Sequence, residues 1–309
     1  MKRWLMAIVA SLLCSVSWAQ SYPTQLNITY VKAPFNLQNI VMKKHGLLDQ
    51  EFAKEGIRIN WIPIKAGLDQ VRGLMSGDID MVAAMNTSTL LMANSTGNRI
   101  LIADGVAHPD DIFAIVAHKD RSIKAISDLK GKRIVGPKGT VVHHLLVAAL
   151  VKEGMSIKDV EFISMNLPAS LTTLVTGHAD AALMVGPGIQ KALSQGHQVL
   201  TRATGLVDTN LVMSVSERFA KRYPEVVRRV VKVNQEALNW IRNHEAEAIA
   251  IGAKEHGISE TDAAQLAQWS GFYSGFTEAD VQSMKLNQAF LMKEKLMRQE
   301  VDVDNLLFR

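Results

Sequence analysis

Short apolar runs alternate with segments of helical periodicity from Leu26 to about Val215. Apolar runs of about four to eight residues separated by helix-length segments are typical of βα units, in which helices cover a mainly parallel sheet. Beyond Val215 the pattern is helical. The strands we expect are 26–31, 57–64, 80–84 and 100–106 in a first group, and 133–136, 160–164, 179–185 and 198–201 in a second.

Two segments that lie one hundred positions apart, 74–82 and 174–182, share one pattern. In each, a glycine is followed three residues later by an aspartate, Asp80 or Asp180, and then by small apolar residues. Glycine readily takes the left-handed conformation that ends a helix, so both segments predict a helix-to-strand corner. Such corners also recur by chance, but together with the alternating pattern they predict two related α/β lobes.

Apolar, strand-like runs at 112–118 and 209–216 flank the second group of strands. We expect these runs to carry the chain between the lobes as two hinge crossings. The first lobe then comprises residues 20–115 and 212–309, and the second lobe comprises residues 116–211.

The helical tail contains two helix-start signals. Ser259 and Thr277 each precede an aspartate by three positions, the spacing of a capping box. We expect these helices to pack back on the first lobe.

The first nineteen residues have the pattern of a secretory signal peptide. Lys2-Arg3 is a basic start, 5–16 is apolar, and 17–19 offers a small-x-small cleavage site. An apolar run of about twelve residues falls short of the ~20 needed to span a bilayer, so a permanent anchor is the weaker interpretation. We expect the mature protein, without residues 1–19, to be soluble and located in the periplasm.

Composition excludes several classes of function. Cys14 is the single cysteine, so the mature chain has no thiol for catalysis, for a disulfide or for a metal. Without Lys2 and Arg3, the 34 basic residues fall to 32 against 30 acidic ones, a net charge of about +2. Because the chain also lacks a clustered basic face, nucleic-acid binding is not expected.

Polar or glycine-rich corners follow four of the expected strands, where helix N-termini present free N–H groups to a ligand. In the first lobe the candidate ligand-binding residues are Lys32, Phe35, Asn36, Asn86, Thr87 and Ser88; in the second they are Gly139, Thr140, Val141, His143, Gly186, Pro187 and Gly188. Taken singly, Asn86, Thr87 and Thr140 could simply cap their helices. Phe35 could form an apolar wall of the pocket or belong to the core.

Motifs of other site classes are missing. The 136–140 corner lacks the Gly-Lys-Ser/Thr end of a P-loop, and no nucleophile or base motif of a known enzyme class is present. His143 and His144 are adjacent, so on a helix they point in different directions and do not predict a metal site. We expect no catalytic residue, no metal and no cofactor.

Several segments carry a family resemblance: Lys65-Ala66-Gly67, Ser-Gly-Asp-Ile-Asp at 76–80, Ile-Ser-Asp-Leu-Lys-Gly-Lys-Arg-Ile at 126–134 and Pro-Lys-Gly-Thr-Val-Val-His-His-Leu-Leu at 137–146. Through them the chain resembles the aliphatic-sulfonate, taurine and nitrate family of periplasmic binding proteins, from about Leu26 to the C-terminus. The resemblance implies a type II two-lobe fold with two hinge crossings, venus-flytrap closure on a ligand, and an ABC permease with its ATPase as partners. A monomer is the default for this architecture.

The ligand is less clear, because the chain departs from the family at two corners. Sulfonate binders of this family typically have a serine-rich helix start where this chain has Thr-Val-Val-His at 140–143, and a Trp-Asp-Pro-Tyr-like corner where it has Val-Gly-Pro-Gly at 185–188. We therefore expect a small organic anion, sulfonate-, nitrate- or carboxylate-like; a larger or more apolar anion and a pyrimidine-type ligand stay open. Two different functions also stay open on this fold, that of a thiamine-pyrimidine synthase and that of an exported sensor for a receptor kinase.

Overall fold

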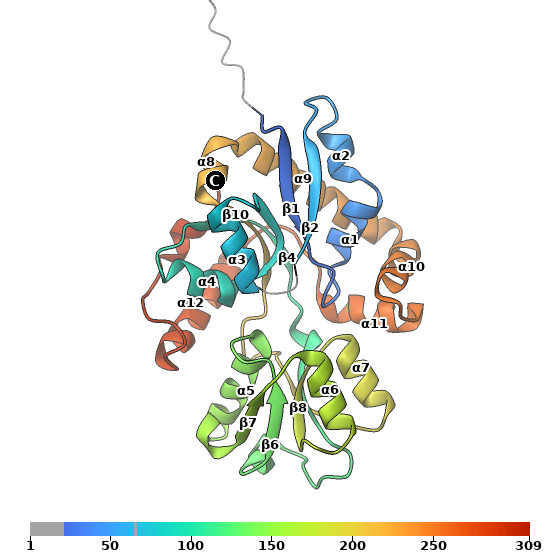
Figure 1. Cartoon of the computed structure of the whole chain (residues 1–309), viewed down its shortest axis with the longest axis vertical. Coiled ribbons are helices and arrows are strands. Elements are labelled where there is room, and N and C mark those ends of the chain that lie inside the picture. The colour runs from blue at the N-terminus through green and yellow to red at the C-terminus, as the bar shows by residue number, and fades with distance from the viewer. Residues whose placement is uncertain (1–21, 65–66) are drawn as a thin grey trace, which may run out of the picture.

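The computed structural model describes residues 22–64 and 67–309, in which two α/β lobes lie one above the other (Figure 1). The expected signal peptide, residues 1–19, lies outside the described residues. None of the helices within the described ranges is both long and apolar enough to cross a membrane.

The first lobe is built around a five-stranded sheet with the strand order β2-β1-β3-β10-β4. Its strands are β1 (Gln25–Tyr30), β2 (Arg58–Pro63), β3 (Met81–Asn86), β4 (Ile100–Ala107) and β10 (Leu211–Ser216). β1 runs parallel to β2 and β3, whereas β10 runs antiparallel to both of its neighbours.

The second lobe repeats this plan with the strand order β7-β6-β8-β5-β9. Its strands are β5 (Phe113–Ala117), β6 (Arg133–Gly136), β7 (Glu161–Ser164), β8 (Ala181–Val185) and β9 (Gln198–Arg202). Here β5 is the strand antiparallel to both neighbours. In each sheet, the strand that is antiparallel to both of its neighbours is the first strand after the chain arrives from the other lobe. The expected two-lobe fold with two crossings is confirmed.

The position of the crossings differs from the expectation. The run 112–118 is mostly β5 and the run 209–216 is mostly β10, so both are strands inside a sheet. The chain passes between the sheets just before each of them, through 108–112 and through 203–210. An apolar run of strand length gains more from burial on both faces in a sheet than from spanning a solvated hinge.

Helices flank both sheets. In the first lobe they are α1 (Leu37–Lys44), α2 (Leu47–Glu51), α3 (Gly67–Ser76) and α4 (Thr87–Asn94), followed in the tail by α8 (Glu217–Arg222), α9 (Pro224–Asn243), α10 (Glu245–His256), α11 (Glu260–Ser270) and α12 (Glu278–Lys293). In the second lobe they are α5 (Val141–Lys152), α6 (Leu167–Val175) and α7 (Pro187–Ser194). As expected, the tail packs on the first lobe: α9 and α10 lie on α1, and α12 lies on α4.

The two corners found one hundred residues apart have the same hydrogen bonds. The Asp80 carboxylate accepts from the backbone N–H of Asn27 at 2.8 Å, and the Asp180 carboxylate accepts from the backbone N–H of Arg133 at 2.9 Å. In return, each aspartate N–H donates to the carbonyl of the same partner residue. The aspartate therefore ties the incoming strand to a parallel neighbour in its own sheet, β3 to β1 in the first lobe and β8 to β6 in the second.

The two helix-start signals predicted in the tail are also confirmed. Ser259 accepts a hydrogen bond from the N–H of Asp262 at the start of α11. At the start of α12, the Thr277 hydroxyl accepts from the N–H of Asp280 while the Asp280 carboxylate accepts from the N–H of Thr277, a complete capping box.

Candidate functional site

The α5 corner of the second lobe is open at Gly139 and Thr140, which are both exposed. Gly139 has a φ of +74°, and a Cβ added there would meet no heavy atom within 4 Å. Thr140 is exposed and stands at the N-cap position, but its hydroxyl donates to the Pro137 carbonyl at 2.9 Å instead of accepting from the helix. The first N–H groups of α5, beginning with the half-buried Val141, are therefore not satisfied by this side chain.

Two histidines follow within the first turns of α5. His143 is buried, and its ring packs on Phe162 with centroids 5.0 Å apart. His144 is only 2% exposed, and neither of its ring nitrogens has a hydrogen-bond partner. Burial lowers the pKa of both imidazoles, that of His144 to about 4, with the neighbouring His143 adding to the effect. His144 is thus held neutral inside the lobe.

The α7 corner lies against the first lobe. Gly186 has a φ of +45°, and its N–H donates to the carbonyl of Ile112 at 2.8 Å. A Cβ on Gly186 would lie 3.5 Å from the Leu266 side chain and 3.7 Å from Pro34, both in the first lobe. Pro187 is the first residue of α7, and a Cβ added to Gly188 would lie 3.5 Å from the sulfur of Met184. This corner brings the two lobes into contact.

The corner after β1 is fastened to the tail of the first lobe. Lys32 Nζ donates to the Glu255 carbonyl at 3.0 Å and lies 3.8 Å from its carboxylate. The Asn36 amide donates to the carbonyls of Val31 and Ala33 within its own loop. Phe35 is 1% exposed and packs on His256, so its side chain belongs to the core and does not form a pocket wall.

The corner after β3 is directed toward the second crossing and α12. Asn86 caps α4 by accepting from the N–H of Ser88. The buried Thr87 hydroxyl donates to Asp208 at 2.8 Å, and the buried Ser88 hydroxyl accepts from Asn287 at 2.9 Å. All three side chains hold the first lobe together at this point.

The structure thus brings the Gly186 corner to the corner after β1, and leaves the α5 corner free on the opposite side. Thr87 and Ser88 have protein partners.

A family model described as NMT1/THI5 like matches residues 51–248. The chain belongs to the NMT1/THI5-like family. Among its relatives, the taurine-binding periplasmic protein of Escherichia coli (strain K12) is 27% identical over 268 residues, which cover 82% of this chain and 81% of that protein.

Solved structures of other proteins share the fold of this NMT1/THI5-like chain. The alkanesulfonate-binding protein SsuA from Xanthomonas axonopodis pv. citri, bound to MOPS, matches with a TM-score of 0.83 and 23% identity, covering 94% of this chain and 99% of that one. The desulfurization enzyme DszB matches with a TM-score of 0.69 and 15% identity, covering 92% and 96%. The type II binding-protein fold is therefore shown, and it carries both binding proteins and an enzyme.

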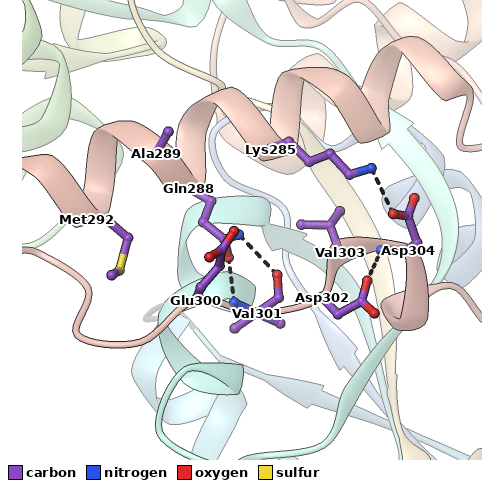
Figure 2. Close-up of a pocket in the computed structure, with 9 residues that line it drawn as sticks. All are labelled: Lys285, Gln288, Ala289, Met292, Glu300, Val301, Asp302, Val303 and Asp304. Carbon is purple, nitrogen blue, oxygen red and sulfur yellow. Dashed lines mark hydrogen bonds and ion pairs between the residues drawn. The ribbon is translucent and has the colours of Figure 1, made fainter.

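Two surface grooves of the NMT1/THI5-like chain are lined partly by residues of α12, and the second of them includes Asp208 and Asn287, the partners of the corner after β3. One, of about 640 Å³, runs between α12 and the C-terminal segment; there Gln288 bonds both backbone groups of Val301, and Lys285 pairs with Asp304 at 2.7 Å (Figure 2). These bonds fasten the C-terminal segment to α12. No group of three or more histidine, cysteine or carboxylate side chains suited to a metal occurs within residues 22–64 and 67–309.

The second groove, of about 610 Å³, lies beside the two crossings. His108 is hydrogen-bonded to Asn210, lies 3.3 Å from the Asp280 carboxylate and stacks on Tyr273 at 3.9 Å between centroids. Burial, together with the nearby carboxylates led by that of Asp280, raises the pKa of Tyr273 well above its usual range. Sequence reasoning did not find this network, because its members are far apart in the chain.

Proposed function

We propose that this chain is the extracytoplasmic solute-binding component of an ABC-type importer, which binds a small organic anion in a cleft between its lobes. Family membership and the binding-protein relatives support the proposal. The same relatives support a periplasmic location and, as partners, an inner-membrane permease with its ATPase. We also propose that the protein works as a monomer without catalytic activity.

The observation that carries the proposal is the arrangement of the two sheets. Both have the same strand order, and they are joined by two short crossings, 108–112 and 203–210. The corner after β8 lies against the corner after β1 of the other lobe, since a Cβ placed on Gly186 would be 3.7 Å from Pro34, and this supports the proposal. Two such lobes can enclose a ligand and exclude water from its hydrogen bonds.

The proposed ligand contacts centre on the α5 corner. The free N–H groups of the first turn of α5 and the Thr140 hydroxyl would donate to an anion, which the positive end of the helix dipole also favours. The Gly186 corner and Lys32 would approach the ligand from the other side. Thr87 and Ser88, whose hydroxyls have protein partners, would support the opposing wall through α4.

The test is a thermal-shift and calorimetric screen of residues 20–309 against sulfonates, nitrate, carboxylates, phosphonates, aromatic acids and pyrimidines. A ligand at 100 times its dissociation constant adds about 2.7 kcal/mol to stability, which moves the midpoint by several degrees. Thr140→Ala should weaken binding of the hit about tenfold, the value of roughly one charge-assisted hydrogen bond.

Thr172→Ala is the matched control, because this exposed hydroxyl on α6 likewise donates to a proline carbonyl, that of Pro168. A screen with no hit, and no small anion in the denatured extract by mass spectrometry, would contradict the proposed function. Equal affinity of the two variants and the parent would contradict the proposed site.

The likeness in fold to an enzyme calls for one further check. Mass spectrometry of the ligand after incubation with the protein separates binding from turnover, and an altered ligand would favour a synthase. Co-purification of the loaded protein with a permease supports import, whereas co-purification with a kinase supports a sensor.

A further inference from the structure

Helix α11 belongs to the tail of the first lobe, yet it also packs on the second lobe. Figure 1 shows it directly above α7, and it contacts both α7 and the 3-10 turn Asp110–Ile112 of the first crossing. Gln190 on α7 donates to the Asp262 carbonyl on α11 at 2.9 Å. The Arg202 guanidinium, at the end of β9, lies 4.3 Å from the centre of the Trp269 ring on α11.

Arg202 joins more than these two elements. Its guanidinium also donates to the backbone carbonyl of Asp111 in the first crossing, and nearby the Thr204 hydroxyl donates to the Asp111 carboxylate at 3.2 Å. Arg202 itself immediately precedes the second crossing. One side chain therefore links both crossings to α11, where the guanidinium and the indole ring attract each other through a cation–π contact.

Apolar packing reinforces these polar contacts. Ala263 and Leu266 of α11 are fully buried in the same apolar cluster as Ile112 and Ala203, which belong to the two crossings. Separating α11 from the two crossings would expose this apolar surface to water, and that cost opposes separation whether or not a ligand is bound.

Within residues 22–64 and 67–309, the opposite flank has no comparable contact between α5 and a helix or strand of the first lobe. Figure 1 shows α5 on the other side of the second lobe from α7, below α3 and α4. There Thr140 is exposed, and a Cβ added to Gly139 would meet no heavy atom within 4 Å. The two flanks of the inter-lobe boundary are thus built differently: one is packed and the other is not.

We propose that four residues form a fixed pivot between the lobes. We call them the α11 bridge: Gln190, Arg202, Asp262 and Trp269. The lobes then separate at the α5 flank while the α7 flank stays in contact. The entrance for a ligand is then the α5 corner. The pivot is a property of the ligand-free protein; only the identity of the entrance rests on the proposed function.

The chain without residues 1–19 has no cysteine, so paired spin labels can be placed without removing native thiols. Distances are measured by pulsed electron resonance in ligand-free protein. The packed-flank pair is Lys191→Cys with Gln265→Cys, and the open-flank pair is Arg72→Cys with Lys138→Cys; all four residues are exposed. A fixed pivot gives a narrow distance distribution for the packed-flank pair and a broader one for the open-flank pair.

Removing the bridge should change this contrast. With Arg202→Ala and Gln190→Ala together, the packed-flank distribution should broaden by several ångströms, whereas Ser194→Ala, an exposed change on α7, should leave it narrow. An equally broad distribution at both flanks of the parent protein overturns the proposal, even if the double variant fails to fold. So does an unchanged packed-flank pair in a folded double variant. Because no ligand is added, neither result bears on the binding screen, which decides the proposed function separately.

Discussion

The buried His144 imidazole should make the protein lose stability in acid. Its pKa is lowered from the usual value of about 6.5 to about 4, because burial disfavours the charged ring. In the unfolded chain the same ring takes up a proton below about pH 6.5. Between these two values the unfolded state binds more protons than the folded state, so the free energy of unfolding falls as the pH falls.

The size of this loss follows from the shift. Each pKa unit corresponds to about 1.4 kcal/mol, so the full shift is worth about 3 kcal/mol, of which roughly 2 kcal/mol is lost by pH 5. The loss is complete once the pH is well below 4, where both states carry the proton. Since folded domains have a total stability of about 5–15 kcal/mol, this is a large share.

The assay is urea unfolding at pH 7, 6, 5 and 4, followed by circular dichroism, for the parent protein and for His144→Leu. Carboxylates that also titrate in this range contribute equally to both proteins, so the difference between their pH profiles isolates His144. The free energy of unfolding of the variant minus that of the parent should be about 2 kcal/mol larger at pH 5 than at pH 7. His178→Leu, at an exposed histidine, should follow the parent. Parallel profiles for the parent and His144→Leu would refute the reasoning.

Three further changes test the packing of the first lobe. Asp104→Ala should lower the free energy of unfolding in urea by about 3 kcal/mol. The buried Asp104 carboxylate accepts from the side chain of Asn234 and from the N–H groups of Gly105 and Gly275, and these donors would lose their partner. A loss below 1 kcal/mol would contradict this account. Gly105→Ala should lower the melting midpoint by several degrees, since its new methyl group would overlap the Gly275 carbonyl; an unchanged midpoint would show that the loop can move away. Thr277→Ala, which removes the capping box of α12, should cost about 1 kcal/mol in the same unfolding assay, and a neutral result would mean that another group caps the helix.

Much of the fold could be predicted because its signals are local. Strand-length apolar runs, the glycine before Asp80 and Asp180, and the capping threonine at 277 each depend on neighbours within a few residues. The runs 112–118 and 209–216 were misplaced because an apolar segment between two lobes has the same local pattern whether it crosses or enters a sheet. Only the pairing partners distinguish the two, and these lie far along the chain.

The candidate site was less predictable for a related reason. Thr87 and Ser88 have the residue types of a ligand-binding helix start, but the same hydroxyls can equally bind protein groups, here Asp208 and Asn287. Nothing in the local sequence distinguishes a ligand from a partner more than a hundred residues away. The contact of Arg202 with Trp269 is similarly invisible in the sequence, because the two residues lie far apart in the chain.

The strand order has a consequence for the order in which the two lobes can fold. All five strands of the second sheet, β5 to β9, are contiguous in the chain, whereas β10 comes from beyond them and inserts between β3 and β4. The segments that pair with β4 are β10, Phe272 and the C-terminal Leu307, and all of them lie downstream of the second lobe. A chain that emerges N-terminus first can therefore complete its second lobe before its first, which stays open until residue 216 has appeared.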